Sequence, residues 1–303
     1  MTFLLAAFTQ ALHIALMLAV APLVVGLQRW TEARLAGRTG PHPWQPWRDL
    51  ARLARKQPAL AENASPLFRT APLACAAAMA VAAALVPSFT LGMAFAPLAD
   101  LLVLAGVLAF GRVALALAAL DAGTAPGGLA ASRTASLACL AEPAMFLVIL
   151  ALGLLGGTTN LDLLIGQQHQ GMLQPPAAAA LAAASLLALA LAGADAPGLT
   201  AEVSGGDLAL IEFAEALRML VWFDLIGALF LPLGMAEPGA GPLGWVAGVL
   251  AWAARLLVLV IGLTALRCTA GRRRLDRTPQ LLGVALALGL LAALLVLASA
   301  VAA

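Results

Sequence analysis

Eight apolar stretches, each about as long as a bilayer is thick, constrain the fold of this chain most. They cover residues 2–28, 70–92, 97–119, 137–158, 175–194, 209–233, 243–266 and 279–302. A helix needs about 20 apolar residues to cross a membrane, and backbone groups in lipid must bond within their own segment. The sequence therefore predicts an all-α, polytopic membrane protein with about eight transmembrane helices.

Charge is too scarce for a soluble domain of this length. Only 11% of the 303 residues are charged and 63% are hydrophobic, whereas soluble domains carry roughly 25% charged residues. The apolar stretches are evenly spaced, and the longest polar segment covers residues 29–69. We expect a single membrane domain over residues 1–303, with residues 29–69 as a long loop within it.

Lys and Arg indicate which side each loop faces. The 17 cationic residues fall into the first, third, fifth and seventh gaps between apolar stretches, or within a turn or two of the helix ends beside them. Cytoplasmic loops are enriched in Lys and Arg. The distribution predicts that residues 29–69 are cytoplasmic and that the N- and C-termini lie outside. The run Arg272–Arg274 is interpreted as a topology anchor in contact with lipid.

The sixth apolar stretch carries ionisable residues at helical spacing. Glu212, Glu215 and Arg218 follow one another at intervals of three residues, so they share one face of a helix, whereas Asp224 lies on the opposite face. Two carboxylates this close in a low dielectric favour a proton on one of them. The pattern predicts a hydrated proton path. The alternative is a structural ion pair between Glu215 and Arg218.

Other ionisable residues extend this prediction or stand apart from it. The set assigned to the proton path is Glu142, Glu202, Asp207, Glu212, Glu215 and Asp224. Asp121 and Arg133 bracket a glycine- and proline-rich inside loop, which would either line a cavity at the membrane edge or be capped by ion pairs. Arg112 lies within the third stretch. His13, alone on an apolar helix, is more often an interior histidine than a ligand.

The sequence offers no redox or catalytic centre. Cys75, Cys139 and Cys268 are dispersed without a C-x-x-C pair, which argues against an iron–sulfur cluster or a structural zinc bound by this chain alone. No Walker loop, nucleophile elbow or H-E-x-x-H motif is present. We predict that the chain binds no cofactor by itself and is a non-catalytic subunit.

Three motifs resemble one family of membrane subunits. The first, Arg38-x-Gly40-Pro41-x-x-x-Gln45-Pro46-x-x-Asp49-x-x-x-Leu53, is similar to the first cytoplasmic loop of complex I subunit 1 (NuoH) and its hydrogenase relatives. The second consists of Leu120-Asp121-x-Gly123, Ala131-Ser132-Arg133 and Glu142-Pro143. The third, Ser204-Gly-x-Asp207-Leu-Ala-Leu-Ile-Glu212-x-Ala214, resembles the hydrogenase branch, which includes hydrogenase-4 component C and formate hydrogenlyase subunit 4.

The resemblance implies a membrane anchor that couples a soluble electron-transfer arm to proton or sodium translocation. Its docking residues would be Arg38, Gly40, Pro41, Gln45, Pro46, Arg48, Asp49 and Arg52. The implied partners are the hydrogenase large and small subunits and iron–sulfur proteins on the cytoplasmic side, antiporter-like membrane subunits, and lipid, but no nucleic acid. The nickel–iron centre and the iron–sulfur clusters would belong to these partners. The implied location is the bacterial inner membrane.

One inside loop departs from the family pattern and leaves two alternatives open. Relatives usually carry a longer, more acidic loop where this chain has the short segment 194–202. That loop helps to shape the quinone cavity in the respiratory branch, so its contraction argues against quinone reduction and leaves fewer groups to receive a proton. The alternatives are a quinone-binding subunit 1 of a respiratory NADH dehydrogenase and a stand-alone transporter, for which no inverted repeat is visible.

Overall fold

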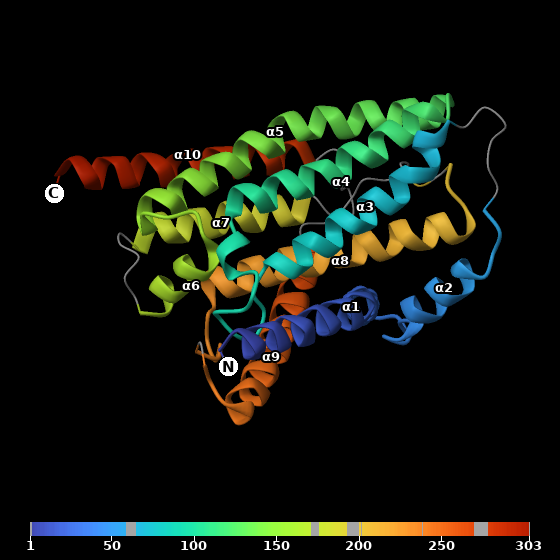
Figure 1. Cartoon of the computed structure of the whole chain (residues 1–303). Coiled ribbons are helices and arrows are strands. Elements are labelled where there is room, and N and C mark those ends of the chain that lie inside the picture. The colour runs from blue at the N-terminus through green and yellow to red at the C-terminus, as the bar shows by residue number, and fades with distance from the viewer. Residues whose placement is uncertain are drawn as a thin grey trace.

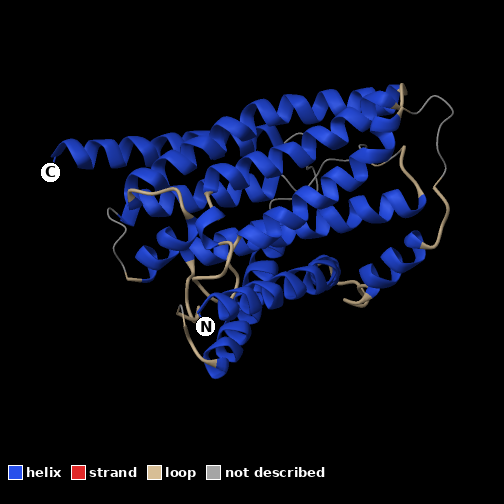
Figure 2. Cartoon of the chain, in the orientation of Figure 1, coloured by secondary structure: helices blue, strands red, loops and turns tan. Residues whose placement is uncertain are grey.

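Helices form the regular secondary structure of the part of the chain that the structure, a computed structural model, describes (Figure 2). This part comprises residues 2–58, 65–170, 176–192, 200, 202–237, 239–269 and 278–302. Its elements are α1 (Thr2–Leu35), α2 (Gln45–Ala54), α3 (Pro66–Leu85), the 3-10 helix η1 (Ala96–Leu98), α4 (Leu101–Asp121), α5 (Ala125–Gly156), α6 (Leu161–His169), α7 (Pro176–Ala192), α8 (Gly205–Phe230), α9 (Pro242–Thr269) and α10 (Thr278–Ala302).

Each apolar stretch of the sequence corresponds to one helix. These helices are α1, α3, α4, α5, α7, α8, α9 and α10. Six of them are long and apolar enough to cross a membrane, and α7 is a shorter apolar helix. α8 has 26 residues, a length of about 39 Å, but carries several charges. The prediction of an all-α, polytopic membrane protein is confirmed.

The loops gather at two ends of the helix bundle. Both termini and α6 lie toward one end, and α2 lies at the other (Figure 1). In the orientation predicted from the cations, α2 marks the cytoplasmic side. We call the end with α2 the inner end and the end with the termini the outer end.

α8 is the central helix of the bundle. It packs against α1, α2, α3, α7 and α9. Beyond its first turns it is enclosed, and Leu217, Leu220 and Leu225 are fully buried. Ionisable side chains are tolerated at membrane depth where they face protein or water instead of lipid. This enclosure explains how α8 can carry Glu215, Arg218 and Asp224 within one apolar segment.

α5 begins earlier than the sequence predicts, and this shortens an inside loop. Thr124 caps the helix, since its hydroxyl oxygen accepts from the Gly127 N–H at 3.1 Å. Pro126 lies in the first turn, where a backbone N–H has no intrahelical acceptor in any case. Only residues 122–124 connect α4 to α5. The predicted glycine- and proline-rich loop is therefore wrong, because most of it is the first turn of a helix.

Candidate functional site

A cavity of about 150 Å³ lies among α4, α5, α7, α8 and α10. Its walls are mainly apolar, and four charged side chains reach it: Arg112, Glu142, Glu215 and Arg218. A buried water needs roughly 10–15 Å³, so several waters fit. The charged face of α8 therefore borders a space that can be hydrated.

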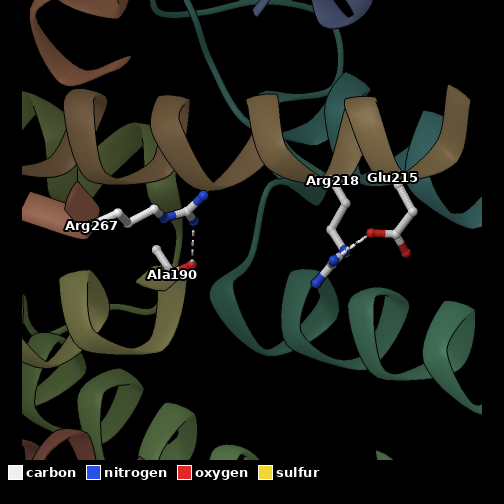
Figure 3. Close-up of polar contacts among 4 residues, drawn as sticks. All are labelled: Ala190, Glu215, Arg218 and Arg267. Atoms are coloured by element: carbon white, nitrogen blue, oxygen red, sulfur yellow. Dashed lines mark hydrogen bonds and ion pairs between the residues drawn. The ribbon is translucent and has the colours of Figure 1, made fainter. Parts of the chain in front are cut away.

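Two ion pairs set the charges of this cavity. Within α8, Arg218 Nε donates to Glu215 Oε2 at 2.8 Å (Figure 3). Between helices, Arg112 Nη2 of α4 donates to Glu142 Oε1 of α5 at 3.5 Å. Pairing lowers the cost of holding charge at membrane depth. The ion pair named as the alternative to a proton path is thus present, and it lies beside a second pair at the same cavity.

Glu212 lies on another side of α8. It is exposed, and the charged groups that act on it most are Arg29 of α1 and Asp49 of α2. Glu215, one turn later, reaches the cavity instead. The stripe predicted from the spacing is therefore divided, because its first residue is directed toward the long loop and its other two toward the cavity.

Asp207 and Glu202 lie at the inner end. Asp207 is in the first turn of α8, where the helix dipole favours negative charge. Glu202 Oε1 accepts from the Thr124 hydroxyl at 2.7 Å, which links the segment before α8 to the start of α5. Both carboxylates therefore lie near helix starts, and Glu202 bonds one of them. Asp195, the other acid of the predicted loop, lies outside the described residues.

Asp121 and Arg133 are not brought together. Asp121 Oδ2 accepts from the Ser65 N–H at 3.0 Å and so joins the end of α4 to the start of α3. Arg133 is exposed on α5. The ion pairs within the described ranges are Asp49–Arg52, Arg112–Glu142 and Glu215–Arg218. The capping ion pairs considered for this loop are thus absent between these two residues.

The predicted docking loop contains the short amphipathic helix α2. Pro46 and Leu50 are buried, whereas Arg48 and Arg52 are exposed. Residues four apart lie on one face of a helix, so the two apolar residues share one face and the two arginines share another. Asp49 pairs with Arg52 along the helix. α2 therefore covers the bundle with one face and presents cations with the other.

Trp47 fixes α2 to the bundle. Its Nε1 donates to the backbone oxygen of Ala19 in α1 at 3.3 Å, and its ring centroid lies 6.5 Å from that of Phe213 in α8. Pro22 interrupts the hydrogen bonds of α1 in this region, because proline lacks an N–H and its ring clashes with the preceding turn. The disturbed turn of α1 thus becomes an anchor point for the long loop.

The first docking residues lie in the connection between α1 and α2. Arg38 and Pro41 are exposed. Gly40 lies against α1, and a Cβ there would come within 3.1 Å of the Trp30 backbone. The docking motif therefore maps to one continuous segment at the inner end, held close to α1 by the absence of a side chain at one position.

A second polar cluster is buried toward the outer end, and it contains Asp224, which the sequence analysis assigned to the proton path but which does not line the cavity. Asp224 Oδ1 accepts from Trp252 Nε1 at 2.7 Å. Arg255 of α9 donates through Nη2 to the Ser88 backbone oxygen at 2.7 Å and through Nη1 to that of Leu231 at 3.3 Å. Both charges are buried, with Asp224 0% and Arg255 7% exposed. The outer cluster, as we name it, consists of His13, Ser88, Asp224, Trp252 and Arg255.

Arg255 is an exception to the expected distribution of cations. The cations were expected in cytoplasmic gaps or near the helix ends beside them, but Arg255 lies in the middle of α9 and bonds the loop that follows α3. That prediction is wrong for this residue. A signal was available, because an arginine in the otherwise uncharged stretch 243–266 needs a partner at membrane depth.

The fold and the cavity define a multi-pass membrane protein that encloses several charged groups within its helix bundle. The chain matches the NADH dehydrogenase family over residues 9–298 and belongs to it. It is 32% identical to hydrogenase-4 component C of Escherichia coli (strain K12), over 73% of this chain and 74% of that protein. Identity to formate hydrogenlyase subunit 4 of the same organism is 29%, over 87% and 90% respectively.

A solved structure shows the same fold. The structure of the membrane-bound sulfane sulfur reductase, an archaeal respiratory membrane complex, contains a chain that aligns with a TM-score of 0.79. The alignment covers 98% of this chain and 100% of that one, at 16% sequence identity. The family resemblance inferred from the motifs is confirmed.

Proposed function

We propose that this chain is the membrane-anchor and coupling subunit of a complex I-like, group 4 nickel–iron hydrogenase in the bacterial inner membrane. It docks a soluble electron-transfer arm at its inner end and links electron flow to proton or sodium translocation. The observation that carries the proposal is the position of α2, whose cations are exposed at the same end as Glu212 and the start of α8. The relatives named for hydrogenase-4 and formate hydrogenlyase favour the hydrogenase branch.

The partners of this subunit carry the redox chemistry. The proposed partners are the hydrogenase large and small subunits and iron–sulfur proteins at the inner end, with antiporter-like subunits beside the bundle in the membrane. The nickel–iron centre and the clusters reside in these proteins. Charge supports this arrangement, because exposed arginines on a rigid helix offer bidentate donors to acidic groups of a docking protein.

The cavity supports proton movement better than binding of a large ligand. Its volume of about 150 Å³ is below the roughly 300–1,000 Å³ of ligand pockets. Glu142 and Glu215 each have an arginine partner there, which stabilises the carboxylate that remains after a proton has left. We propose that water in this cavity carries protons between the two carboxylates.

Glu215→Gln is expected to lower the proton gradient formed per turnover by roughly half or more, while electron turnover is retained. Glutamine keeps the size of the side chain and still accepts from Arg218, but it cannot bind and release a proton. Vesicles containing the whole complex, assayed with a pH-sensitive dye alongside hydrogen production, measure both quantities. Glu237→Gln, at an exposed outer-loop carboxylate, is the matched control. Unchanged coupling in Glu215→Gln would contradict the proton path.

Reversing the charge of α2 is expected to release the soluble arm. Arg48→Glu with Arg52→Glu turns two exposed cations into anions without touching the buried face of the helix. Sedimentation of membranes, followed by detection of the soluble subunits, should find most of them in the supernatant. Arg69→Glu, an exposed cation on α3 near the same end, should leave them bound. Full co-sedimentation of the double variant would overturn the docking surface.

A further inference from the structure

The outer cluster leaves two buried polar atoms without a hydrogen-bond partner in the described part of the chain. They are Asp224 Oδ2 and Arg255 Nε. The two charged groups attract each other, but they are not within ion-pair distance. Unpartnered buried polar atoms are costly, and internal water commonly supplies the missing hydrogen bonds.

Polar groups continue from Arg255 to α1. Arg255 Nη2 donates to the Ser88 backbone oxygen at 2.7 Å, and the Ser88 hydroxyl lies 2.7 Å from His13 Nδ1. His13 Nε2 lies 2.9 Å from the backbone oxygen of Ala83. Because a carbonyl oxygen only accepts, Nε2 carries the proton, and Nδ1 of the neutral ring accepts from Ser88. Nδ1 is therefore a basic site that faces the outer cluster.

A further buried polar side chain, Gln10, bonds the outer loops. Gln10 lies one turn from His13 on α1; its Nε2 donates to the Ala84 oxygen at 3.0 Å, and its Oε1 accepts from the Phe95 N–H at 3.1 Å. Gln10 and Asp162 border the same packed region beneath the outer loops, which has no room for a water molecule. Burial raises the pKa of the Asp162 carboxyl. Asp162 is therefore a titratable group beside the outer loops that Gln10 bonds.

An apolar layer separates Asp224 from the inner cavity. Leu217, Leu220 and Val221 lie between Glu215 and Asp224 in the sequence of α8 and are fully buried. The two carboxylates are about 14 Å apart along the helix. A proton from the cavity must pass these residues to reach Asp224. The bundle therefore holds two separate polar regions, one toward each end.

We propose that the outer cluster is a hydrated proton-binding site that serves as the proton exit. A water is shared between Asp224 Oδ2 and Arg255 Nε. When the Oδ2–H bond of Asp224 breaks, the proton bonds to this water. The Ser88 hydroxyl takes up a proton from the water and gives its own to His13 Nδ1, and the imidazolium becomes neutral again by losing its Nε2 proton toward the outer end. A proton from the inner cavity then restores the Oδ2–H bond of Asp224. Arg255 stays charged and stabilises the carboxylate that remains. The inference rests on the proposed function, since it supplies the outer half of the path that begins at the cavity.

Asp224→Asn in the complete membrane complex tests this exit. Asparagine keeps the acceptor for Trp252 but cannot bind and release a proton, so the proton gradient per turnover should fall by roughly half or more with electron turnover retained. A turnover-dependent infrared change of a protonated carboxyl should be lost in the same variant. Thr264→Val removes the other unpartnered buried oxygen recorded on α9 and should change neither readout.

Ser88→Ala provides a milder second variant, in case Asp224→Asn does not assemble. It keeps the backbone oxygen that Arg255 uses and removes only the hydroxyl bonded to His13, so coupling should again fall. A cluster with a purely structural role would leave the gradient per turnover unchanged. If only Glu215→Gln lowers coupling, the exit is wrong and the proposed function stands. If none of the three variants lowers it, the proposed function fails as well.

Discussion

Arg255→Leu is expected to destabilise the membrane domain by about 3–5 kcal/mol, because two backbone oxygens lose their charged hydrogen-bond donor. Arg255 bonds the backbone oxygens of Ser88 and Leu231, which follow the C-terminal ends of α3 and α8, where a cation is favourable. Its positive charge also attracts the Asp224 carboxylate. Thermal unfolding of the purified complex in detergent, together with its yield in membranes, measures the loss.

A double variant separates the charge effect from the loss of packing. Asp224→Asn combined with Arg255→Leu removes both charges and keeps the acceptor for Trp252, so part of the lost stability should return. Leu257→Ala, at a side chain of α9 that is 47% exposed, should change stability little. A double variant no more stable than Arg255→Leu alone would show that the charge of Asp224 is not what Arg255 compensates.

The transmembrane helices could be predicted because backbone groups in lipid must form hydrogen bonds within their own segment. An apolar stretch of sufficient length must be a helix, so each predicted stretch is one. The loops offered weaker signals: α2 has only 10 residues, and its buried face is set by Pro46 and Leu50 alone. The start of α5 was missed because Pro126 reads as a loop residue, although it also fits the first turn of a helix.

The candidate site could be predicted only where partners lie on one helix. Glu215 and Arg218 are three residues apart, and their ion pair follows from helical spacing. By contrast, Arg112 and Glu142 are 30 residues apart, and Arg255 and Ser88 are 167 apart. Such pairs depend on how helices pack, which a single sequence does not reveal. An isolated charge in an apolar stretch predicts a partner without identifying it.

Gly26→Ala is expected to displace α2 and release the soluble arm without any change of charge. A Cβ on Gly26 of α1 would lie 1.9 Å from the backbone oxygen of Pro43, far inside contact distance. Backbone cannot yield by changing rotamer, so the connection to α2 must move, with an overpacking cost of about 1–3 kcal/mol. Trp47, four residues further on, would then lose its bond to α1. Increased protease cleavage near α2 and loss of co-sedimenting soluble subunits report this displacement.

Gly262→Ala is the matched control for this change. It introduces the same methyl group in α9, where nothing lies within 4 Å of the added Cβ. Because alanine is favoured over glycine within a helix by roughly 0.5–1 kcal/mol, this variant should be as stable as the original or slightly more so, with the soluble arm still bound. Because Gly26→Ala is expected to lower stability and Gly262→Ala is not, the difference between the two variants measures the contact with Pro43. Equal behaviour of the two variants would mean that the long loop is not held against α1 at this point.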